Sequence, residues 1–341
     1  MFIMNLTNNN NRSSSRAAVI VRRCRLLAIV CCFVFIVLAS KTFRVPRTLW
    51  KYSRLTPRTE YMPPTTITIV KEPSLLCTDE LYILVLVHTD PSHVKNRHFI
   101  RQTWGNPENY ERKTKVLFLM AVSPFELVNK QVENEIVRYG DIVLGDFVES
   151  WKNLTYKSVM GLSWMVERCP HAKYLLKLDD DILVDAFRLL ELLGSFTDST
   201  KRSLICYVVE DLPLIRDKTA RHYVSKTEYF DDRFVDYCSG AAYIIPGNLV
   251  PKLLISSKRV PLFKMEDVYI TGMLAVDAGI SHYKINHEYT FREETDWTRY
   301  QSSKTYHIIF TYHAKEEHLD TLWEHFKNHH QSKPTKMKRL S

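Results

Sequence analysis

The fold is decided by residues 174–184, Tyr-Leu-Leu-Lys-Leu-Asp-Asp-Asp-Ile-Leu-Val, where an apolar run leads directly into three carboxylates. Residues 174–178 are typical of a buried strand, and α/β proteins bind ligands at the carboxyl edge of their sheets. In an extended chain Asp179 and Asp181 point to the same side, so one can bind a metal while the other meets a nucleotide or a water. Because hard divalent cations prefer oxygen ligands, the acids form a candidate metal site; a solvated turn is the alternative.

Alternating apolar and helical segments around this stretch predict one α/β domain at residues 76–330. Continuous apolar runs are typical of strands that are buried on both faces. Their alternation with helical patterns predicts a parallel or mixed sheet flanked by helices. The predicted strands are 81–87, 115–122, 142–147, 174–178, 203–209, 241–245 and 306–312, and the clearest predicted helices are 154–168, 185–194 and 267–278.

The distribution of charge argues against a body that binds nucleic acid. The net charge is +9, but residues 1–60 alone hold eleven Lys or Arg and one acid, and the last nine residues add four more basic groups. The body between these ends is net acidic and so lacks the electrostatic footprint of a nucleic-acid-binding protein. The sequence has only nine glycines, where average usage predicts roughly 24. Without a glycine-rich phosphate loop, any phosphate must be bound by a metal and basic side chains.

The N-terminal region carries a predicted membrane anchor. Residues 1–25 are polar and basic, and residues 26–40 (LLAIVCCFVFIVLAS) form a charge-free apolar run. We expect a single short span at 26–40 whose flanking basic side chains reach the membrane surfaces; a cleaved signal peptide is the alternative. Basic residues are equally frequent on the two sides, so charge does not set the orientation. The proline-rich residues 41–75 are predicted to be a stem and residues 331–341 a basic tail.

The chemistry predicted for four cysteines and one asparagine depends on the compartment in which the body folds. Beyond the predicted span lie four cysteines, Cys77, Cys169, Cys206 and Cys238. In an oxidising compartment this even number permits two disulfides with three possible pairings, and four free thiols are the alternative. Asn153 begins an Asn-Leu-Thr sequon and is a candidate glycosylation site in the same compartment.

Two further segments carry side chains suited to catalysis or metal binding. Glu266 and Asp267 open a predicted helix. Acids are ordinary capping residues there, but a carboxylate on a rigid element can also act as a general base. His313 follows the apolar run 306–312. A histidine at a strand end is usually just partly exposed, yet imidazole suits Mn²⁺ alongside carboxylates.

Five motifs in order resemble the β-1,3-glycosyltransferase family, which contains the β-1,3-galactosyl- and β-1,3-N-acetylglucosaminyltransferases. Residues 97–105 are similar to the family's R-x-x-I-R-x-T-W-G, and residues 146–161 to its D-F-x-D-x-Y-x-N-L-T-x-K segment. The acid triplet, the Tyr-Cys-Ser-Gly at 237–240 and the Glu-Asp-Val-Tyr at 266–269 follow. The tail from 313 to 323 is also similar, so the resemblance covers about residues 81–325.

The resemblance implies a single nucleotide-sugar-binding domain of the GT-A type in a type II Golgi membrane protein, with the N-terminus cytosolic and the body lumenal. It also implies a role for each candidate residue. Asp267 is the expected catalytic base, with Glu266 as the neighbour most easily confused with it. The expected ligands of Mn²⁺ or Mg²⁺ are Asp179, Asp181 and His313, and the expected contacts to the UDP-sugar are Arg97, Arg101, Lys157, Asp179 and Asp180.

The function implied is inverting transfer of Gal, GlcNAc or GalNAc from a UDP-sugar, in β-1,3 linkage, to an oligosaccharide acceptor on a glycoprotein or glycolipid. Two alternatives use the same residues. A pseudoenzyme would bind glycan or UDP-sugar without turnover. A glycosidase would need two carboxyl groups flanking the scissile bond and no nucleotide.

The sequence departs from the family pattern close to the expected substrates. Ala241 and Ala242 stand where the family's C-S-G-G-G-Y segment has glycine. Thr271 stands where its E-D-V-Y-V-G-x-C pattern has glycine, and Met273 replaces the cysteine. Asp185 stands where an asparagine usually follows the acid triplet and its apolar run. The sequence therefore leaves the sugar specificity and the disulfide pattern open.

Overall fold

The computed structural model describes residues 67–73, 77–78, 80–110, 113–198, 200–291, 308–312 and 316–331. These residues belong to one compact unit. The predicted anchor at 26–40 and the predicted tail at 1–25 lie outside the described residues, as does His313. Within the described part of the chain, no helix combines the length and apolar character that a membrane span needs.

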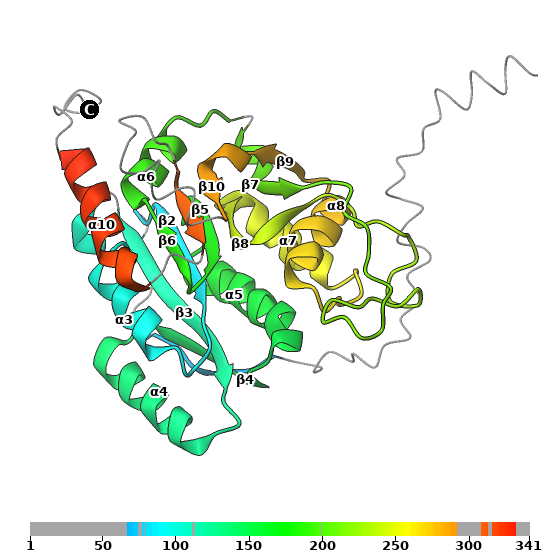
Figure 1. The fold of residues 1–341 in the computed structure, drawn as a ribbon, viewed down its shortest axis with the longest axis horizontal. Helices are drawn as coiled ribbons and strands as arrows, with labels where there is room; N and C mark the ends of the chain where they lie inside the picture. Colours follow the sequence, from blue (N-terminus) through cyan, green and yellow to red (C-terminus); the bar gives the residue numbers. More distant parts are fainter. Residues whose placement is uncertain are drawn as a thin grey trace, which may run out of the picture. The chain divides into compact units, whose positions relative to one another are not determined.

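A mixed sheet of eight strands forms the centre of the domain, as the sequence predicts (Figure 1). Three of the central pairings are parallel, namely β4–β3, β3–β2 and β2–β5. The next pairing, β5–β8, is antiparallel. In spatial order the strands are β1 (Ile69–Lys71), β4 (Ile142–Val148), β3 (Thr114–Val122), β2 (Ile83–His88), β5 (Tyr174–Asp179), β8 (Tyr237–Pro246), β7 (Ser203–Val209) and β9 (Ser281–Lys284).

Strand β1 corrects one predicted boundary. It pairs antiparallel with β4, so the folded body begins inside the segment 41–75 that we predicted to be a stem. The strand has only three residues, and none of them is buried. An exposed edge strand of this length carries no hydrophobic periodicity by which it could be predicted.

Helices cover both faces of the sheet because alternate residues of each strand point to opposite sides. Leu86 of β2 faces α5, where Gly161 permits contact; a Cβ there would lie 2.9 Å from Leu86 and 2.5 Å from Leu119. Val85 lies on the other face, in a core shared with α3, α4, α6 and α10. The helices are α3 (Val94–Gln102), α4 (Glu126–Tyr139), α5 (Leu154–Arg168), α6 (Ala186–Gly194), α7 (Val250–Ser257), α8 (Leu274–Ala278) and α10 (Glu316–Gln331).

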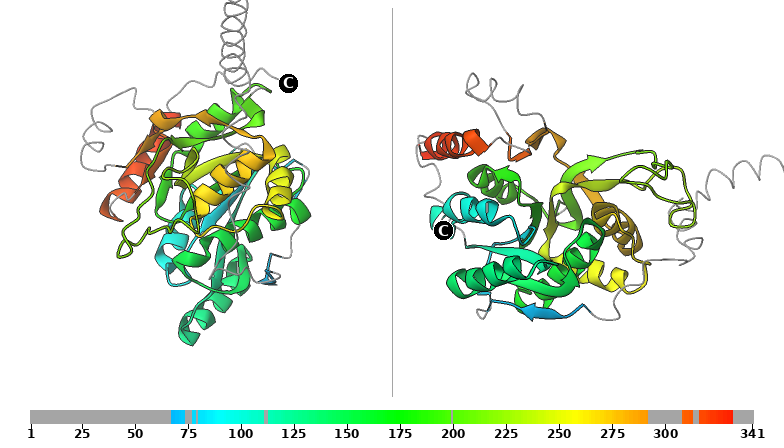
Figure 2. Two further views of the ribbon diagram at one scale, coloured as in Figure 1. Left: turned by 90° about the vertical axis from the view of Figure 1, so that its right-hand side faces the viewer. Right: turned by 60° about the horizontal axis from the view of Figure 1, so that its bottom comes forward.

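Shorter helical turns connect these elements. The 3₁₀ turns are η1 (Pro107–Asn109), η2 (Trp151–Asn153), η3 (Thr200–Arg202), η4 (Gly247–Leu249) and η6 (Asn286–Glu288). The predicted helix at 267–278 is instead two segments, a π-helix η5 (Val268–Met273) followed by α8. Segments distant in sequence also meet: α10, drawn in red, lies beside α3 and α6 (Figure 2).

A small second sheet brings the C-terminal part of the chain to the acid triplet. It consists of β10 (Tyr289–Thr290), β11 (Phe310–Tyr312) and β6 (Ile182–Val184), in that order. Strand β11 is antiparallel to β6, with Tyr312 opposite Ile182. The backbone just before His313 is therefore paired with the backbone just after Asp181.

Two disulfides select one of the three pairings that the sequence permits. Cys77 pairs with Cys169, which ties the segment before β2 to the end of α5. Cys206 pairs with Cys238 and links the neighbouring strands β7 and β8. All four candidate cysteines are thus bonded, and the alternative of free thiols does not hold in this structure.

Candidate active site

The three acids after β5 face different parts of the protein. The register places Asp179 beside His88 at the carboxyl edge of β5 and β2. Asp180 turns toward α3, where its carboxylate accepts hydrogen bonds from Thr89 and Asn96 and lies 2.9 Å from Nδ1 of His93. This hydrogen bond to Asp180 raises the pKa of His93. Asp180 therefore fastens the β5–β6 turn to the start of α3.

Asp179 is held by a buried lysine that the sequence analysis did not identify. The ammonium group of Lys177 lies 2.8 Å from Oδ1 of Asp179, 2.7 Å from the Gly240 carbonyl oxygen and 3.5 Å from Oε2 of Glu266. Burial by itself would lower the pKa of Lys177, but Asp179 and Glu266 outweigh it and the pKa is raised. Lys177 is thus a buried cation between the acid triplet that follows β5 and the Glu266–Asp267 pair.

The Asp179 carboxylate is crowded by protein although its side chain keeps 40% of its surface accessible. Withdrawal from water raises the pKa of Asp179 to about 6, against the opposing charge of Lys177, and the charge of Asp181 raises it further. A carboxylate destabilised in this way gains from a cation placed beside it. Asp179 therefore fits a site that binds a metal or a nucleotide.

Glu266 and Asp267 are adjacent in sequence but have different environments. Glu266 is buried, and its carboxylate accepts hydrogen bonds from Ser158 and from the Tyr243 hydroxyl, the latter at 2.6 Å, beside Lys177. The Glu266 carboxylate thus already accepts hydrogen bonds from donors of the protein itself. The side chain is therefore suited to support the site and poorly suited to receive a substrate proton.

Asp267 is the more available acid of the pair. It is half-buried at the start of η5, and within the described residues its carboxylate accepts one hydrogen bond, from the Val268 N–H at 2.9 Å. The carboxylate lies against Gly240, where a Cβ would come within 3.3 Å of its Oδ2. Burial, followed by the charge of Glu266, raises the pKa of Asp267 to about 6. A pKa near the working pH is what a general base requires.

The candidate metal ligands are only partly within the described residues. Burial raises the pKa of Tyr312, and the charges of Asp181 and Asp179 raise it further, which places this residue close to both acids. His313 follows Tyr312 but is not described. Among the residues that the structure describes, no three His, Cys, Asp or Glu side chains converge as a metal site. The two carboxylates fit Mn²⁺ or Mg²⁺ as oxygen donors, and further ligands must come from elsewhere.

Arg97 and Arg101 lie inside the protein and not on a ligand-facing surface. Arg97 is 0% exposed and makes two hydrogen bonds to Glu135, at 2.6 and 3.0 Å. Arg101 forms a two-pronged ion pair with Asp141, at 2.8 and 2.9 Å, and also contacts Glu135. Both guanidinium groups join α3 to α4, and that of Arg101 also joins α3 to the loop after α4. Direct contact with UDP would require these ion pairs to break.

Lys157 is committed to the protein in a similar way. Its ammonium group is 2.7 Å from Glu149 and 2.9 Å from the Thr89 carbonyl oxygen, and it is almost fully buried. Burial lowers the pKa of Lys157 although Glu149 opposes the effect. The next residue, Ser158, contacts both His88 and Glu266. Helix α5 therefore contacts the candidate site through Lys157 and Ser158.

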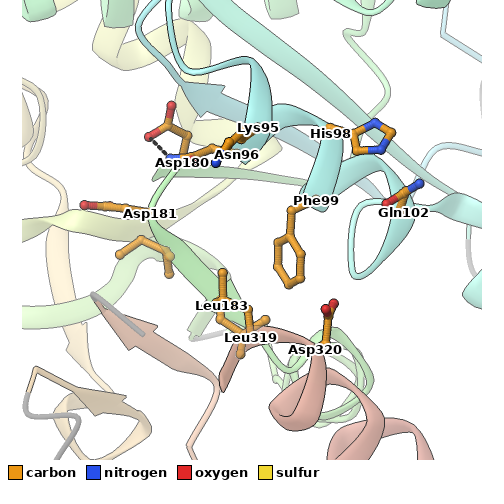
Figure 3. Close-up of a pocket in the computed structure, with 11 residues that line it drawn as sticks. Lys95, Asn96, His98, Phe99, Gln102, Asp180, Asp181, Leu183, Leu319 and Asp320 are labelled. Carbon is orange, nitrogen blue, oxygen red and sulfur yellow. Dashed lines mark hydrogen bonds between the residues drawn. The ribbon is translucent and has the colours of Figure 1, made fainter. Parts of the chain in front are cut away.

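A cavity of about 520 Å³ lies beside the acid triplet, between α3 and α10 (Figure 3). Phe99, Leu183 and Leu319 provide apolar walls, Asp180 and Asp181 lie at one end, and Asp320 lies at the other. Pockets that bind small molecules have this size and this mixture of apolar walls with a few polar groups. The triplet thus borders space for a ligand on its α3 side.

The pattern of the sequence itself indicates that Lys177 has a buried acidic partner. Lys177 and Asp179 are two residues apart in a strand and so share a face, and a lysine within an apolar strand needs a buried counter-charge. Ser158, Tyr243 and Gly240 had no comparable signal, because their roles depend on elements that meet only in the fold.

Asn153 ends η2, and its side-chain nitrogen donates to the Val148 carbonyl oxygen at 2.8 Å. Thr155 of the same sequon is buried, and its hydroxyl donates to Phe263. A glycan on Asn153 would have to displace the hydrogen bond to Val148. Glycosylation at Asn153 stays a prediction.

Comparisons with known proteins match the body of the chain. Residues 95–286 match the family model described as galactosyltransferase. Human β-1,3-galactosyltransferase 1 is 30% identical over 258 residues, which cover 75% of this chain and 77% of that protein. Human β-1,3-galactosyltransferase 5 is 33% identical over 190 residues, 55% of this chain and 61% of that protein. A solved galactosyltransferase, LgtC with donor and acceptor sugar analogues, is similar over 74% of this chain and 96% of its own, but a TM-score of 0.35 at 14% identity is too low to bear on the site.

Proposed function

The chain belongs to the galactosyltransferase family and is a glycosyltransferase, and on that premise we propose that it is an inverting β-1,3-hexosyltransferase. Its donor would be UDP-Gal, UDP-GlcNAc or UDP-GalNAc, and its acceptor an oligosaccharide on a glycoprotein or glycolipid. The mixed sheet with helices on both faces would then be a fold of the GT-A type.

One observation supports this proposal above the others: Lys177 and Gly240 connect the expected donor site to the expected base. Lys177 contacts Asp179 and the carbonyl oxygen of Gly240. Gly240 in turn lies against the carboxylate of Asp267. A donor whose diphosphate is held through a divalent cation at Asp179 and Asp181 would therefore bind close to the proposed base, since the charge of Asp179 is felt by Asp267. No other pair of acids in the described residues combines raised pKa values with this arrangement.

The chemistry then needs one displacement at the anomeric carbon. The acceptor hydroxyl oxygen forms a bond to C1 as the bond from C1 to the UDP oxygen breaks, which inverts an α-linked donor to a β-linked product. Asp267 takes the proton of the hydroxyl, and UDP departs with the bonding electron pair. Asp181, Asp179 and His313 would hold Mn²⁺ or Mg²⁺. Such an ion, when bound, supplies Lewis-acid stabilisation of charge on the departing diphosphate.

We also propose that the protein is a single-pass type II membrane protein of the Golgi with its body in the lumen. The two disulfides support this, because such bonds persist in oxidising compartments. Resistance of the tagged full-length protein to carbonate extraction tests the anchor at 26–40. A mature N-terminus near Ser40 would instead indicate a cleaved signal peptide.

A UDP-release assay with purified full-length protein tests the activity. UDP-Gal, UDP-GlcNAc and UDP-GalNAc would each be offered with a panel of glycan acceptors and Mn²⁺. We expect acceptor-dependent UDP release with one donor, and we expect Asp181→Ala to weaken Mn²⁺ and UDP-sugar binding together. Binding of UDP without release under any condition would identify a pseudoenzyme, and nucleotide-independent cleavage of glycans would identify a glycosidase.

A further inference from the structure

A threonine joins the helix that begins after Asp267 to strand β8. Helix η5 is a π-helix whose six residues are all buried, and the N–H of Leu274 at its end donates to Tyr269, five residues earlier. Such segments are rare and are frequent at functional sites. Thr271 lies in the middle of η5.

The Thr271 hydroxyl bonds to both elements. It accepts a hydrogen bond from the Cys238 N–H at 2.8 Å and lies 2.6 Å from the Asp267 carbonyl oxygen, to which it donates. The pairing of β7 with β8 shifts register between Cys206 and Val208, next to Cys238. The hydroxyl therefore bonds to β8 where the strand ladder is irregular.

Two glycines allow η5 to approach β8 on either side of this link. A Cβ at Gly240 would lie 3.3 Å from both Cβ and Oδ2 of Asp267. A Cβ at Gly272 would lie 2.9 Å from Val235 and 3.2 Å from Cβ of Tyr237. The glycines permit this close approach without setting its direction, whereas the Thr271 hydrogen bonds have a defined direction.

We propose that Thr271 is a positioning residue for the base, whose hydroxyl holds the main chain of Asp267 at a defined place over β8. The inference rests on the proposed function, in which Asp267 accepts the proton of the acceptor hydroxyl. A displacement of about 1 Å at a reacting group can cost about 100-fold in rate, so we expect the loss of this main-chain hydrogen bond to lower turnover.

The test compares two variants of the full-length protein that differ by one oxygen atom, Thr271→Ser and Thr271→Ala. We expect Thr271→Ala to lower kcat on the order of 10-fold, with KM for the donor and Kd for UDP unchanged. Thr271→Ser keeps the hydroxyl and should retain most of the wild-type kcat. Thr271→Val, which keeps the shape of threonine, provides a second comparison with Ser if the Ala variant does not fold.

Thr103→Ala is the matched control. The Thr103 hydroxyl also donates to the carbonyl oxygen four residues earlier, at 2.7 Å, and its side chain is also buried, but it lies in the loop after α3. This control should lose stability without losing kcat. Equal kcat for the Ser and Ala variants of Thr271, or an equal loss in Thr103→Ala, would overturn the inference. Asp267→Asn is measured in parallel, because normal turnover in that variant would reject the proposed base itself, independently of Thr271.

Discussion

Replacement of Asp267 by asparagine should lower activity and raise stability together. As the proposed base, Asp267 contributes through general-base catalysis, so Asp267→Asn should lower turnover by about 10²–10⁴-fold while UDP binding stays nearly intact. Asparagine retains the side-chain oxygen that accepts the hydrogen bond from the Val268 N–H. The start of η5 should therefore survive the change.

The gain in stability follows from the pKa of Asp267. The pKa is raised from 3.8 to about 6, so the native state keeps its proton to a higher pH than the unfolded chain does. The contribution of this group to the free energy of unfolding is complete below about pH 4 and is lost as the pH rises through about 6. At about 1.4 kcal/mol for each pKa unit, the ionised Asp267 lowers the free energy of unfolding at neutral pH by at most about 3 kcal/mol. Asp267→Asn removes this cost. Because the side chain is only half-buried, solvent screening reduces the expected gain to about 1–2 kcal/mol.

Thermal unfolding of full-length protein in detergent, with a chelator to remove divalent cations, measures this gain. We expect the Tm of Asp267→Asn to exceed that of the wild type by several degrees at pH 7.5 and by less at pH 5. Glu266→Gln is the contrasting variant, because Glu266 accepts two hydrogen bonds and lies 3.5 Å from Lys177. It should lower Tm at both pH values. Near-normal turnover in Asp267→Asn, or a Tm difference that does not depend on pH, would refute the reasoning.

Two further predictions concern the buried cations. Lys177→Met removes a charge that lowers the pKa of Asp267, so the acid limb of the pH–rate profile should move to higher pH; an unmoved limb would show that Lys177 does not influence the base. Arg97→Met leaves Glu135 with one fewer partner in a buried ion pair, so the free energy of unfolding in urea should fall by about 3 kcal/mol while the Kd for UDP stays constant. A variant with wild-type stability and weakened UDP binding would instead support the predicted contact of Arg97 with the UDP-sugar.

The strand that leads into the acid triplet was predictable because it follows from local sequence. A continuous apolar run that ends in carboxylates identifies both β5 and the carboxyl edge of the sheet, the edge at which α/β proteins bind ligands. The predicted helix 154–168 likewise matches α5 almost residue for residue, since its periodicity extends over four turns. Short elements such as β1 were not predictable, because a three-residue edge strand has no pattern of its own.

The assignment of individual charges was much less predictable. Arg97 and Lys157 are the right kind of residue for a diphosphate, but a sequence does not show that Glu135 and Glu149 lie beside them. Their partners come from other elements, and ion pairs in the interior are decided by which elements pack together. The sequence analysis therefore identified the cations but not their contacts.

By itself, the sequence determined the class of fold, the strand edge that carries the acid triplet and the acids that compete for each proposed role, because periodicity and motif spacing are local properties. The family resemblance favoured Asp267 over Glu266 as the base, but only the tertiary structure showed that their environments differ. Successive residues at a helix start point about 100° apart, and one of these two meets Ser158 and Tyr243 while the other faces Gly240. The pairing of the cysteines was decided in the same way, because β7 and β8 become neighbours only in the folded sheet.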